Sequence, residues 1–183
     1  MTIKQTELRG VLLIEPTVYE DRRGFFFESY SFRLYEEHGI TQTFVQDNHS
    51  RSEHNTVRGL HYQLQPGQSK LVRVVHGEVW DVAVDIRVGS PTYGQHLGRT
   101  LSAGNKQQLY IPAGFAHGFC VLSESAEIEY KVTTYYAPEK ERGIFYRDPA
   151  LAIPWPCEDA IISDRDTGLP SLADAENDFI YIP

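Results

Sequence analysis

Three side chains of this sequence, His61, Lys70 and Tyr130, could together move a proton on and off a carbon atom beside a ketone. Histidine titrates near neutral pH, so His61 could act as the base. Lys70 could stabilise the charge on the resulting enolate oxygen, and Tyr130, whose phenol is protonated at pH 7, could return a proton from the other side. Each residue alone is more typical of a structural strand position or a surface charge. The combination predicts proton transfer at carbon without a metal or an organic cofactor.

His117 is a further candidate, at the end of a Pro-x-Gly-x-x-His segment over residues 112–117. Between two strands, this pattern resembles the second motif of the cupin superfamily. In metal-binding cupins a first motif adds two histidines and a glutamate. Here Gln63 stands where the second of those histidines is expected, and no glutamate follows at the usual distance. We therefore expect His117 to donate a hydrogen bond in a metal-free site; a divalent metal held by His61 and His117 is the alternative.

Short apolar or alternating segments between Gly and Pro turns predict an all-β fold, either a sandwich or a barrel. The predicted strands cover residues 11–14, 25–29, 43–46, 70–75, 79–86, 108–111, 119–122 and 128–135. One helix is predicted over 31–38, with Ser31 as its cap and Gly39 at its end. The strand 79–86 alternates, so one face is core and the other faces solvent or a polar cavity.

The chain has 183 residues, enough for one domain with a sizeable core, and we expect a single domain over 1–183 with a tail from about residue 149 that wraps the barrel. Its net charge of -8 argues against a nucleic-acid surface. No segment has the apolar length of a membrane span or the pattern of a signal peptide, so a cytoplasmic location is expected. The two cysteines, Cys120 and Cys157, form no CxxC pair, and Cys120 is expected in the core.

Several residues could bind a phosphorylated ligand. Because arginine binds phosphate in a bidentate manner, the candidates are Arg23, Arg58 and Arg165, together with Lys70. Phe26 and its two neighbours, Phe25 and Phe27, could stack on a nucleobase, but at least one of the three is expected in the core.

The spacing of Arg58 and His61 presents a geometric difficulty. The two positions differ by an odd number, so an ideal strand would point the side chains to opposite faces. Gly59 could mark a bulge that turns both side chains inward. Otherwise Arg58 would reach a ligand from the rim of the barrel.

Taken together and in order, several segments resemble the dTDP-4-dehydrorhamnose 3,5-epimerase family over nearly the whole chain. They are Phe25-Phe-Phe-Glu28-Ser, Phe44-Val-Gln46-Asp-Asn48, Arg58-Gly-Leu-His61, Lys70-Leu-Val-Arg, Phe-Ala-His117-Gly-Phe, Tyr130-Lys and Ser163-Asp-Arg-Asp166. The resemblance implies a cupin-type double-stranded β-helix, or jelly-roll barrel, with a few short peripheral helices. It also implies conversion of dTDP-4-dehydro-6-deoxy-D-glucose to dTDP-4-dehydro-L-rhamnose, in dTDP-L-rhamnose or related deoxysugar biosynthesis.

The resemblance implies a role for each site residue. His61 would be the general base, paired with Asp166. Tyr130 would be the general acid on the opposite face, and Lys70 would lie near the sugar C4 oxygen. The positions implied to hold the nucleotide sugar are Arg23, Glu28, Gln46, Asn48, Arg58, His117, Glu141 and Arg165. The family exchanges its N-terminal strand across a homodimer, so Arg23 and Glu28 would complete the site of the partner.

The sequence departs from the family pattern in modest ways. The stretch 63–70 is about one residue short, Arg165 stands where lysine is frequent, and Tyr146 stands where tryptophan is common. The alternatives are an epimerase acting only at C3 or only at C5, a 3,4-ketoisomerase, a metal-dependent cupin oxygenase or isomerase, and a non-catalytic sugar-nucleotide binding module. The presence of both His61 and Tyr130 favours an epimerase.

Overall fold

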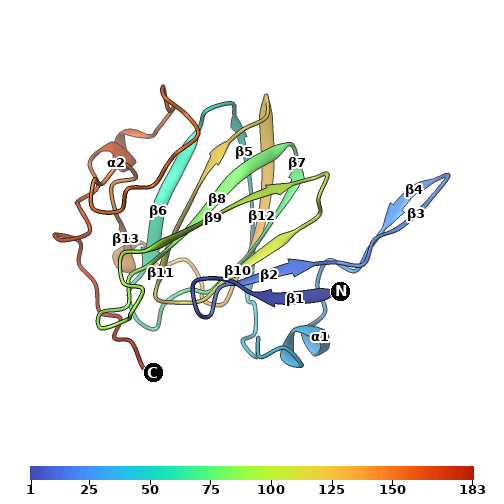
Figure 1. The fold of residues 1–183 in the computed structure, drawn as a ribbon, viewed down its shortest axis with the longest axis horizontal. Coiled ribbons are helices and arrows are strands. Elements are labelled where there is room, and N and C mark those ends of the chain that lie inside the picture. The colour runs from blue at the N-terminus through green and yellow to red at the C-terminus, as the bar shows by residue number, and fades with distance from the viewer.

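The computed structural model describes residues 1–183, which form two antiparallel sheets facing each other (Figure 1). The first sheet contains, in spatial order, β1 (Thr2–Gln5), β2 (Leu12–Glu15), β10 (Gln108–Ile111), β7 (Lys70–His76), β12 (Ser125–Val132) and β5 (Gln46–Glu53). The second contains β13 (Glu141–Gly143), β6 (Val57–Gln63), β11 (Phe115–Val121), β8 (Glu78–Asp85) and β9 (His96–Ser102). The chain crosses repeatedly from one sheet to the other, as in a jelly roll. The predicted all-β fold is confirmed.

The remaining elements are short and peripheral. They are α1 (Phe32–Glu36), the 3-10 helix η1 (Pro138–Lys140), and α2 (Asp164–Thr167) in the C-terminal tail. A hairpin of β3 (Tyr19–Asp21) and β4 (Gly24–Phe26) projects away from both sheets (Figure 1). None of the helices combines the length and apolarity that a membrane span requires.

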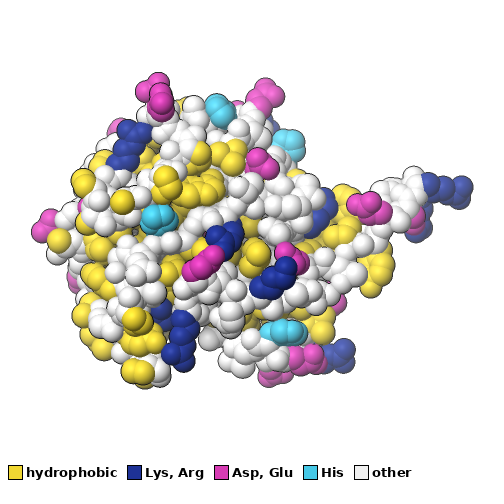
Figure 2. Space-filling model, viewed as in Figure 1, with side chains coloured by type: hydrophobic (Ala, Val, Ile, Leu, Met, Phe, Trp, Pro, Cys, Tyr) yellow, Lys and Arg dark blue, Asp and Glu magenta, His cyan; other side chains and the backbone are white.

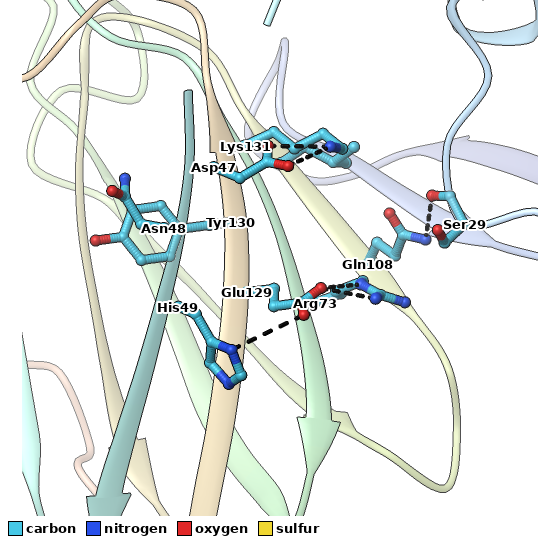
Figure 3. A pocket seen from close by; sticks show the side chains of 10 residues that line it. Ser29, Asp47, Asn48, His49, Arg73, Gln108, Glu129, Tyr130 and Lys131 are labelled. Carbon is cyan, nitrogen blue, oxygen red and sulfur yellow. Dashed lines mark hydrogen bonds and ion pairs between the residues drawn. The ribbon is translucent and has the colours of Figure 1, made fainter. Parts of the chain in front are cut away.

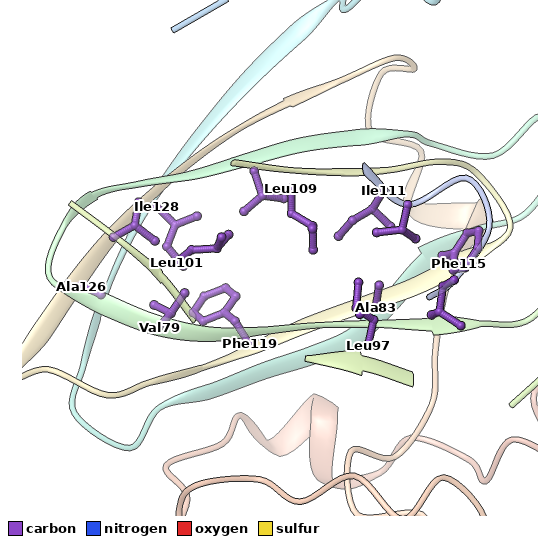
Figure 4. Packing of buried hydrophobic residues seen from close by; sticks show 14 of the residues in the cluster. Val79, Ala83, Leu97, Leu101, Leu109, Ile111, Phe115, Phe119, Ala126 and Ile128 are labelled. Carbon is purple, nitrogen blue, oxygen red and sulfur yellow. The ribbon is translucent and has the colours of Figure 1, made fainter. Parts of the chain in front are cut away.

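One large apolar cluster fills the space between the sheets (Figure 4). Its members include Val72, Leu109 and Ile128 from the first sheet, and Val79, Leu101 and Phe119 from the second. These side chains are almost completely buried, and burial of a side chain of this size contributes about 1.5–3 kcal/mol. The same period-two alternation that predicts the strands therefore fills the barrel.

Both faces of β8 are buried. Val79 and Ala83 face the barrel core, on the same side as Asp81. Val82 and Val84 pack outside the barrel in a second apolar cluster that includes Leu151 and Phe179. The C-terminal tail thus covers the outer face of the second sheet, and Asp81 lies inside the barrel.

The helix and strand bounds differ in places from the predicted ones. The helix predicted over 31–38 is shorter in the structure, where α1 spans only Phe32–Glu36. Ser31 occupies its N-cap position but makes no side-chain capping bond. The strands β1, β3, β9 and β13 were not predicted, and no bounds were predicted for β6, the strand of His61. The strand predicted over 43–46 shares only Gln46 with β5, and β12 begins and ends three residues earlier than expected. Cys120 is buried as a free thiol, as predicted.

The expectation that Phe25, Phe26 or Phe27 lies in the core is wrong for this chain. Phe25 and Phe26 are exposed and Phe27 is only half-buried. The strand that carries them ends at Phe26 and belongs to the projecting hairpin, which has no sheet of its own chain to pack against.

Candidate active site

A cavity of about 640 Å³ is lined from both sheets and from the tail. Its lining residues are Ser50, Thr56, Val57, Arg58, His61, Lys70, His117, Gly118, Phe119, Tyr130, Glu141, Ile161, Ile162, Ser163, Arg165 and Asp166. All four residues predicted to be catalytic are among them. Segments more than a hundred positions apart in the sequence therefore meet at one site.

His61 and Asp166 form a hydrogen-bonded pair. His61 Nε2 lies 2.8 Å from Asp166 Oδ1, and the backbone N–H of Gly59 donates to Asp166 Oδ2 at 3.2 Å. Burial alone would raise the pKa of Asp166, but the hydrogen bonds from His61 and Gly59 and the nearby positive charges outweigh burial and hold that pKa below its usual value. Asp166 is therefore a carboxylate that can stabilise a protonated His61.

The local fold fixes the direction of this pair. Ser163 caps α2, and its hydroxyl accepts from the backbone N–H of Asp166 at 3.2 Å. Arg165 Nη2 lies 3.0 Å from His61 Nε2, but Arg165 Nη1 donates to Glu141 at 2.8 Å. A nitrogen that donates to Asp166 cannot also accept from a guanidinium. Since His61 Nε2–H is directed at the carboxylate, Nδ1 is the nitrogen that can take up a proton.

Lys70 supplies a buried positive charge. It is the first residue of β7, and its Nζ lies 3.5 Å from the backbone oxygen of His61, a long contact for an ammonium group. Burial lowers the pKa of Lys70 to about 8, while the charges of Asp81 and Glu141 oppose this decrease. At neutral pH the protonated form predominates, and it can stabilise a negative oxygen.

His117 and Asp81 form a second, deeper pair. His117 Nε2 lies 2.9 Å from Asp81 Oδ2, and the two side chains are 7% and 0% exposed. Strand pairing places His117 opposite His61. Burial lowers the pKa of His117 more than the Asp81 charge raises it, so the ring is neutral at pH 7. The neutral ring donates to Asp81 through Nε2 and presents Nδ1 as an acceptor; it can donate to a ligand only when protonated.

Tyr130 lies on β12 opposite Asn48 of β5. Figure 3 shows the phenol and Asn48 on one side of these strands, and Asp47 and Glu129 on the other, where a smaller hollow of about 160 Å³ is found. Burial raises the pKa of Tyr130 above its usual value, so the phenol is a proton donor at neutral pH. Its side of the strand is the side of the larger cavity.

Arg58 and His61 both line the larger cavity, despite their odd spacing. Gly59 has a φ of +116°, and the register between β6 and β11 shifts beside it. A Cβ atom on Gly118 would lie only 2.6 Å from the backbone oxygen of Arg58, so the two strands approach too closely here for a side chain. The irregularity expected at Gly59 is present, and it turns both functional side chains inward.

A family model described as dTDP-4-dehydrorhamnose 3,5-epimerase matches residues 5–174 of this chain. The chain is 58% identical over 178 residues to the dTDP-4-dehydrorhamnose 3,5-epimerase of Pseudomonas aeruginosa, an alignment that covers 96% of this chain and 98% of that protein. The chain belongs to the dTDP-4-dehydrorhamnose 3,5-epimerase family.

Solved structures related to this epimerase family share its fold. The dTDP-6-deoxy-D-glucose-3,5-epimerase of Legionella pneumophila, in complex with dTDP-4-keto-L-rhamnose, matches with a TM-score of 0.92 and 54% identity, covering 94% of this chain and 93% of that chain. A 3'-monoepimerase from Streptomyces bikiniensis, in complex with dTDP-quinovose, matches with a TM-score of 0.87 and 32% identity, covering 92% of this chain and 86% of that chain. The predicted cupin-type jelly roll is confirmed. Because a monoepimerase has the same fold, the fold alone does not set how many carbons are inverted.

The residues predicted to bind the nucleotide sugar fall into three groups in this epimerase. The first group lines the cavity and consists of Arg58, His117, Glu141 and Arg165. The second group is Gln46 and Asn48 at the start of β5, joined by a hydrogen bond of 2.8 Å but outside the cavity lining. The third group is Arg23, Phe26 and Glu28, on or just after the projecting hairpin.

The single chain does not bring this third group to the cavity. Phe26 is 70% exposed, and the Arg23 guanidinium pairs with Asp21 of its own hairpin. Figure 2 shows cationic side chains at the tip of this hairpin and hydrophobic ones along it. The hairpin therefore presents a charged and apolar surface that its own barrel does not use.

Two residues of the epimerase site were not predicted. Asp81 interrupts an apolar strand at a core-facing position, and such a charge is a sequence signal of a buried polar pair. Tyr136 donates a hydrogen bond of 2.8 Å to Glu141, and so extends the Glu141–Arg165 ion pair at the cavity edge. Among eleven tyrosines, nothing in the sequence distinguishes Tyr136.

Gln63, at the position of a cupin histidine ligand, forms structural hydrogen bonds here. Its Nε2 donates to Thr134 Oγ1 at 3.3 Å, and its Oε1 accepts from the backbone N–H of Ala137 at 2.7 Å. The side chain therefore anchors the loop before η1. No group of three or more His, Cys, Asp or Glu side chains is gathered as metal ligands.

Proposed function

We propose that this chain inverts C3 and C5 of dTDP-4-dehydro-6-deoxy-D-glucose and yields dTDP-4-dehydro-L-rhamnose, in dTDP-L-rhamnose or related deoxysugar biosynthesis. The observation that carries the proposal is that the His61–Asp166 pair, Tyr130 and Lys70 all line one cavity. The relatives at 50% identity and above, over nearly the whole chain, carry the name of the two-carbon enzyme. This supports inversion at both positions.

His61 removes the proton in this mechanism. The C4 ketone makes the hydrogens at C3 and C5 weakly acidic, and the free Nδ1 of His61 takes one of them. The imidazolium that forms is stabilised by Asp166, whose carboxylate already accepts the Nε2–H at 2.8 Å. Because the pair is built before the substrate arrives, little reorganisation is needed during the reaction.

Lys70 and Tyr130 complete the inversion. The negative charge moves to the C4 oxygen, where the Lys70 ammonium stabilises it; a preorganised donor of this type contributes about 2.7–4 kcal/mol. Tyr130 then donates its phenol proton to the opposite face of the carbon. A ring flip or small shift presents the second carbon to the same groups. Diphosphate binding, with Arg58 and Arg165 on the cavity wall, supplies binding energy remote from the reacting carbons.

The projecting hairpin supports a homodimer with exchanged N-terminal strands. Its aromatic side chains Tyr19, Phe25 and Phe26 are exposed in the single chain, and the Arg23 side chain, paired with Asp21 of the same hairpin, is 84% exposed. In an exchanged dimer these residues and Glu28 would complete the nucleotide site of the partner. A cytoplasmic location stays a prediction, which cell fractionation would test.

The decisive experiment is turnover of dTDP-4-keto-6-deoxyglucose in deuterium oxide, with the product analysed by NMR. The expected result is deuterium at both C3 and C5 of the sugar. His61→Ala and Tyr130→Phe should lose turnover while keeping the fold, whereas the matched controls His38→Ala and Tyr93→Phe should not. Turnover without deuterium at either carbon would refute proton transfer by these groups.

The same experiment separates the alternatives. Deuterium at one carbon alone indicates a single-position epimerase, and movement of the ketone from C4 to C3 indicates a 3,4-ketoisomerase. Activity that is lost on chelation and restored by iron, manganese or zinc would identify a metal-dependent cupin. Tight binding of the nucleotide sugar without any exchange would identify a binding module.

A further inference from the structure

Three ionisable side chains lie buried together in the barrel: Asp81, His117 and Lys70. His117 and Lys70 line the sugar-sized cavity, but Asp81 does not, so it can act on the site only through these two neighbours. A buried carboxylate is costly unless it is paired and fully hydrogen-bonded. Its position therefore calls for a reason beyond packing.

Asp81 and Lys70 each have hydrogen-bonding capacity that the structure leaves unused. Asp81 Oδ2 accepts from His117 at 2.9 Å, but Asp81 Oδ1 is buried and has no partner. The Lys70 ammonium, with three N–H groups, makes one long contact of 3.5 Å with the His61 backbone oxygen. A buried anionic oxygen and an under-coordinated ammonium group on which its charge acts are complementary.

We propose that Asp81 is a positioning residue of the epimerase, which orients His117 through Oδ2 and, through Oδ1, keeps the Lys70 ammonium charged and directed at the C4 oxygen of the sugar. The inference rests on the proposed function and adds a group that never touches the substrate. In the resting enzyme one shared water links Oδ1 to an N–H of Lys70. When charge develops on the C4 oxygen, the ammonium divides its N–H groups between that oxygen and Asp81.

The charges around Lys70 make this assignment specific. The ionisable groups around the same cavity are His61 on β6, His117 on β11, Tyr130 on β12, Glu141 on β13, and Arg58, Arg165 and Asp166. Burial lowers the pKa of Lys70 to about 8, and among these groups and Asp81 only the charges of Asp81 and Glu141 act to raise it. Glu141 is already paired with Arg165 at 2.8 Å. Loss of the Asp81 charge should therefore lower the Lys70 pKa further.

Asp81→Asn tests this inference because it keeps the shape and an acceptor for His117 but removes the charge. Asp85→Asn is the matched control: Asp85 is on the same strand and equally buried, but it is bonded to Arg87, Ser90 and Thr92. In kcat profiles from about pH 6 to 9.5, the alkaline limb of Asp81→Asn should move about one pH unit lower. Its rate should therefore fall about six-fold further below wild type at pH 8.5 than at pH 6.5. Affinity for dTDP alone should change less than about two-fold, and Asp85→Asn should keep the wild-type limb.

An unshifted alkaline limb in Asp81→Asn, or an equal loss of rate at every pH, would overturn the inference. If the variant does not fold, a crystal structure of the wild-type enzyme decides, because the partner of Asp81 Oδ1 must be Lys70 Nζ or a water that also contacts it. Any other partner overturns the inference. Wild-type enzyme that gives no deuterium exchange would refute the proposed function instead, so the two failures are distinguishable.

Discussion

The close approach of the paired strands β6 and β11 predicts that one added methyl group at Gly118 will lower the catalytic rate. A Cβ atom there would lie 2.6 Å from the backbone oxygen of Arg58, 3.1 Å from Leu60 Cδ2 and 3.2 Å from Gly59 Cα. The Leu60 side chain can turn, but the backbone oxygen can move only with its strand. To reach an ordinary contact, β6 must shift by about 0.4–0.8 Å relative to β11.

That shift would act directly on the site, because Arg58 and His61 lie on β6 and His117 lies beside Gly118 on β11. A displacement on the order of 1 Å in a reacting group lowers the rate roughly 100-fold. We therefore expect Gly118→Ala to lower kcat by about 10–100-fold. Overpacking of this kind should also lower the free energy of unfolding by about 1–3 kcal/mol.

The measurements are steady-state kinetics on the 4-keto sugar nucleotide and urea unfolding. Gly104→Ala is the matched control, because a Cβ atom there would meet only the Ser102 hydroxyl, at 3.5 Å. It should leave both kcat and the free energy of unfolding within error of wild type. Gly118→Ala with wild-type kcat would refute the claim that this close approach of β6 and β11 sets the positions of Arg58 and His61.

Three further predictions concern the catalytic groups and the hairpin. Asp166→Asn should lower kcat by roughly 10³–10⁴-fold with little change in dTDP affinity, since it removes the charge opposite His61, and an equal loss in the exposed Asp164→Asn would contradict this. In wild type, kcat should fall as pH rises through about 8, because the active form of Lys70 is the ammonium and burial lowers its pKa to that value; a flat profile to about pH 9.5 would contradict it. Co-expression of Arg23→Ala with His61→Ala should give about a quarter of wild-type activity from two inactive variants, because in an exchanged dimer one mixed site keeps both groups; no recovery in purified mixed dimers would refute the exchange.

The sequence carries enough information to identify the catalytic groups but not to show how they meet. His61, Lys70 and Tyr130 could be selected by type because each has a distinct acid–base chemistry at neutral pH. Asp166 is 105 positions from His61, and no local periodicity connects them. Only the family resemblance implies that pairing, and the folded chain places the two side chains in hydrogen-bond contact.

Local sequence patterns could not predict the features that depend on long-range packing. The strands β1, β9 and β13 lie at sheet edges, where their pairing partners, rather than their own alternation, define them. Phe25 and Phe26 have the composition of a core strand, yet they are exposed because the hairpin leaves its own barrel. Conversely, Asp81 has the chemistry of a surface residue but is completely buried, where its carboxylate accepts a hydrogen bond from His117 on the neighbouring strand.

The two His–Asp pairs of this site have the same chemistry, and their environments assign them different roles. Asp81 holds His117 where its ring is 7% exposed, and burial lowers the pKa of that ring, so His117 stays neutral and orients the site. His61 lies against the Asp166 carboxylate, and at 23% exposure its ring keeps contact with solvent. Tyr130 delivers solvent deuterium to the product, and the base on the other face must release the proton that it removed before the next turnover. Of the two histidines, His61 alone meets that requirement, and for this reason deuterium incorporation should fail in His61→Ala even where His117 is intact.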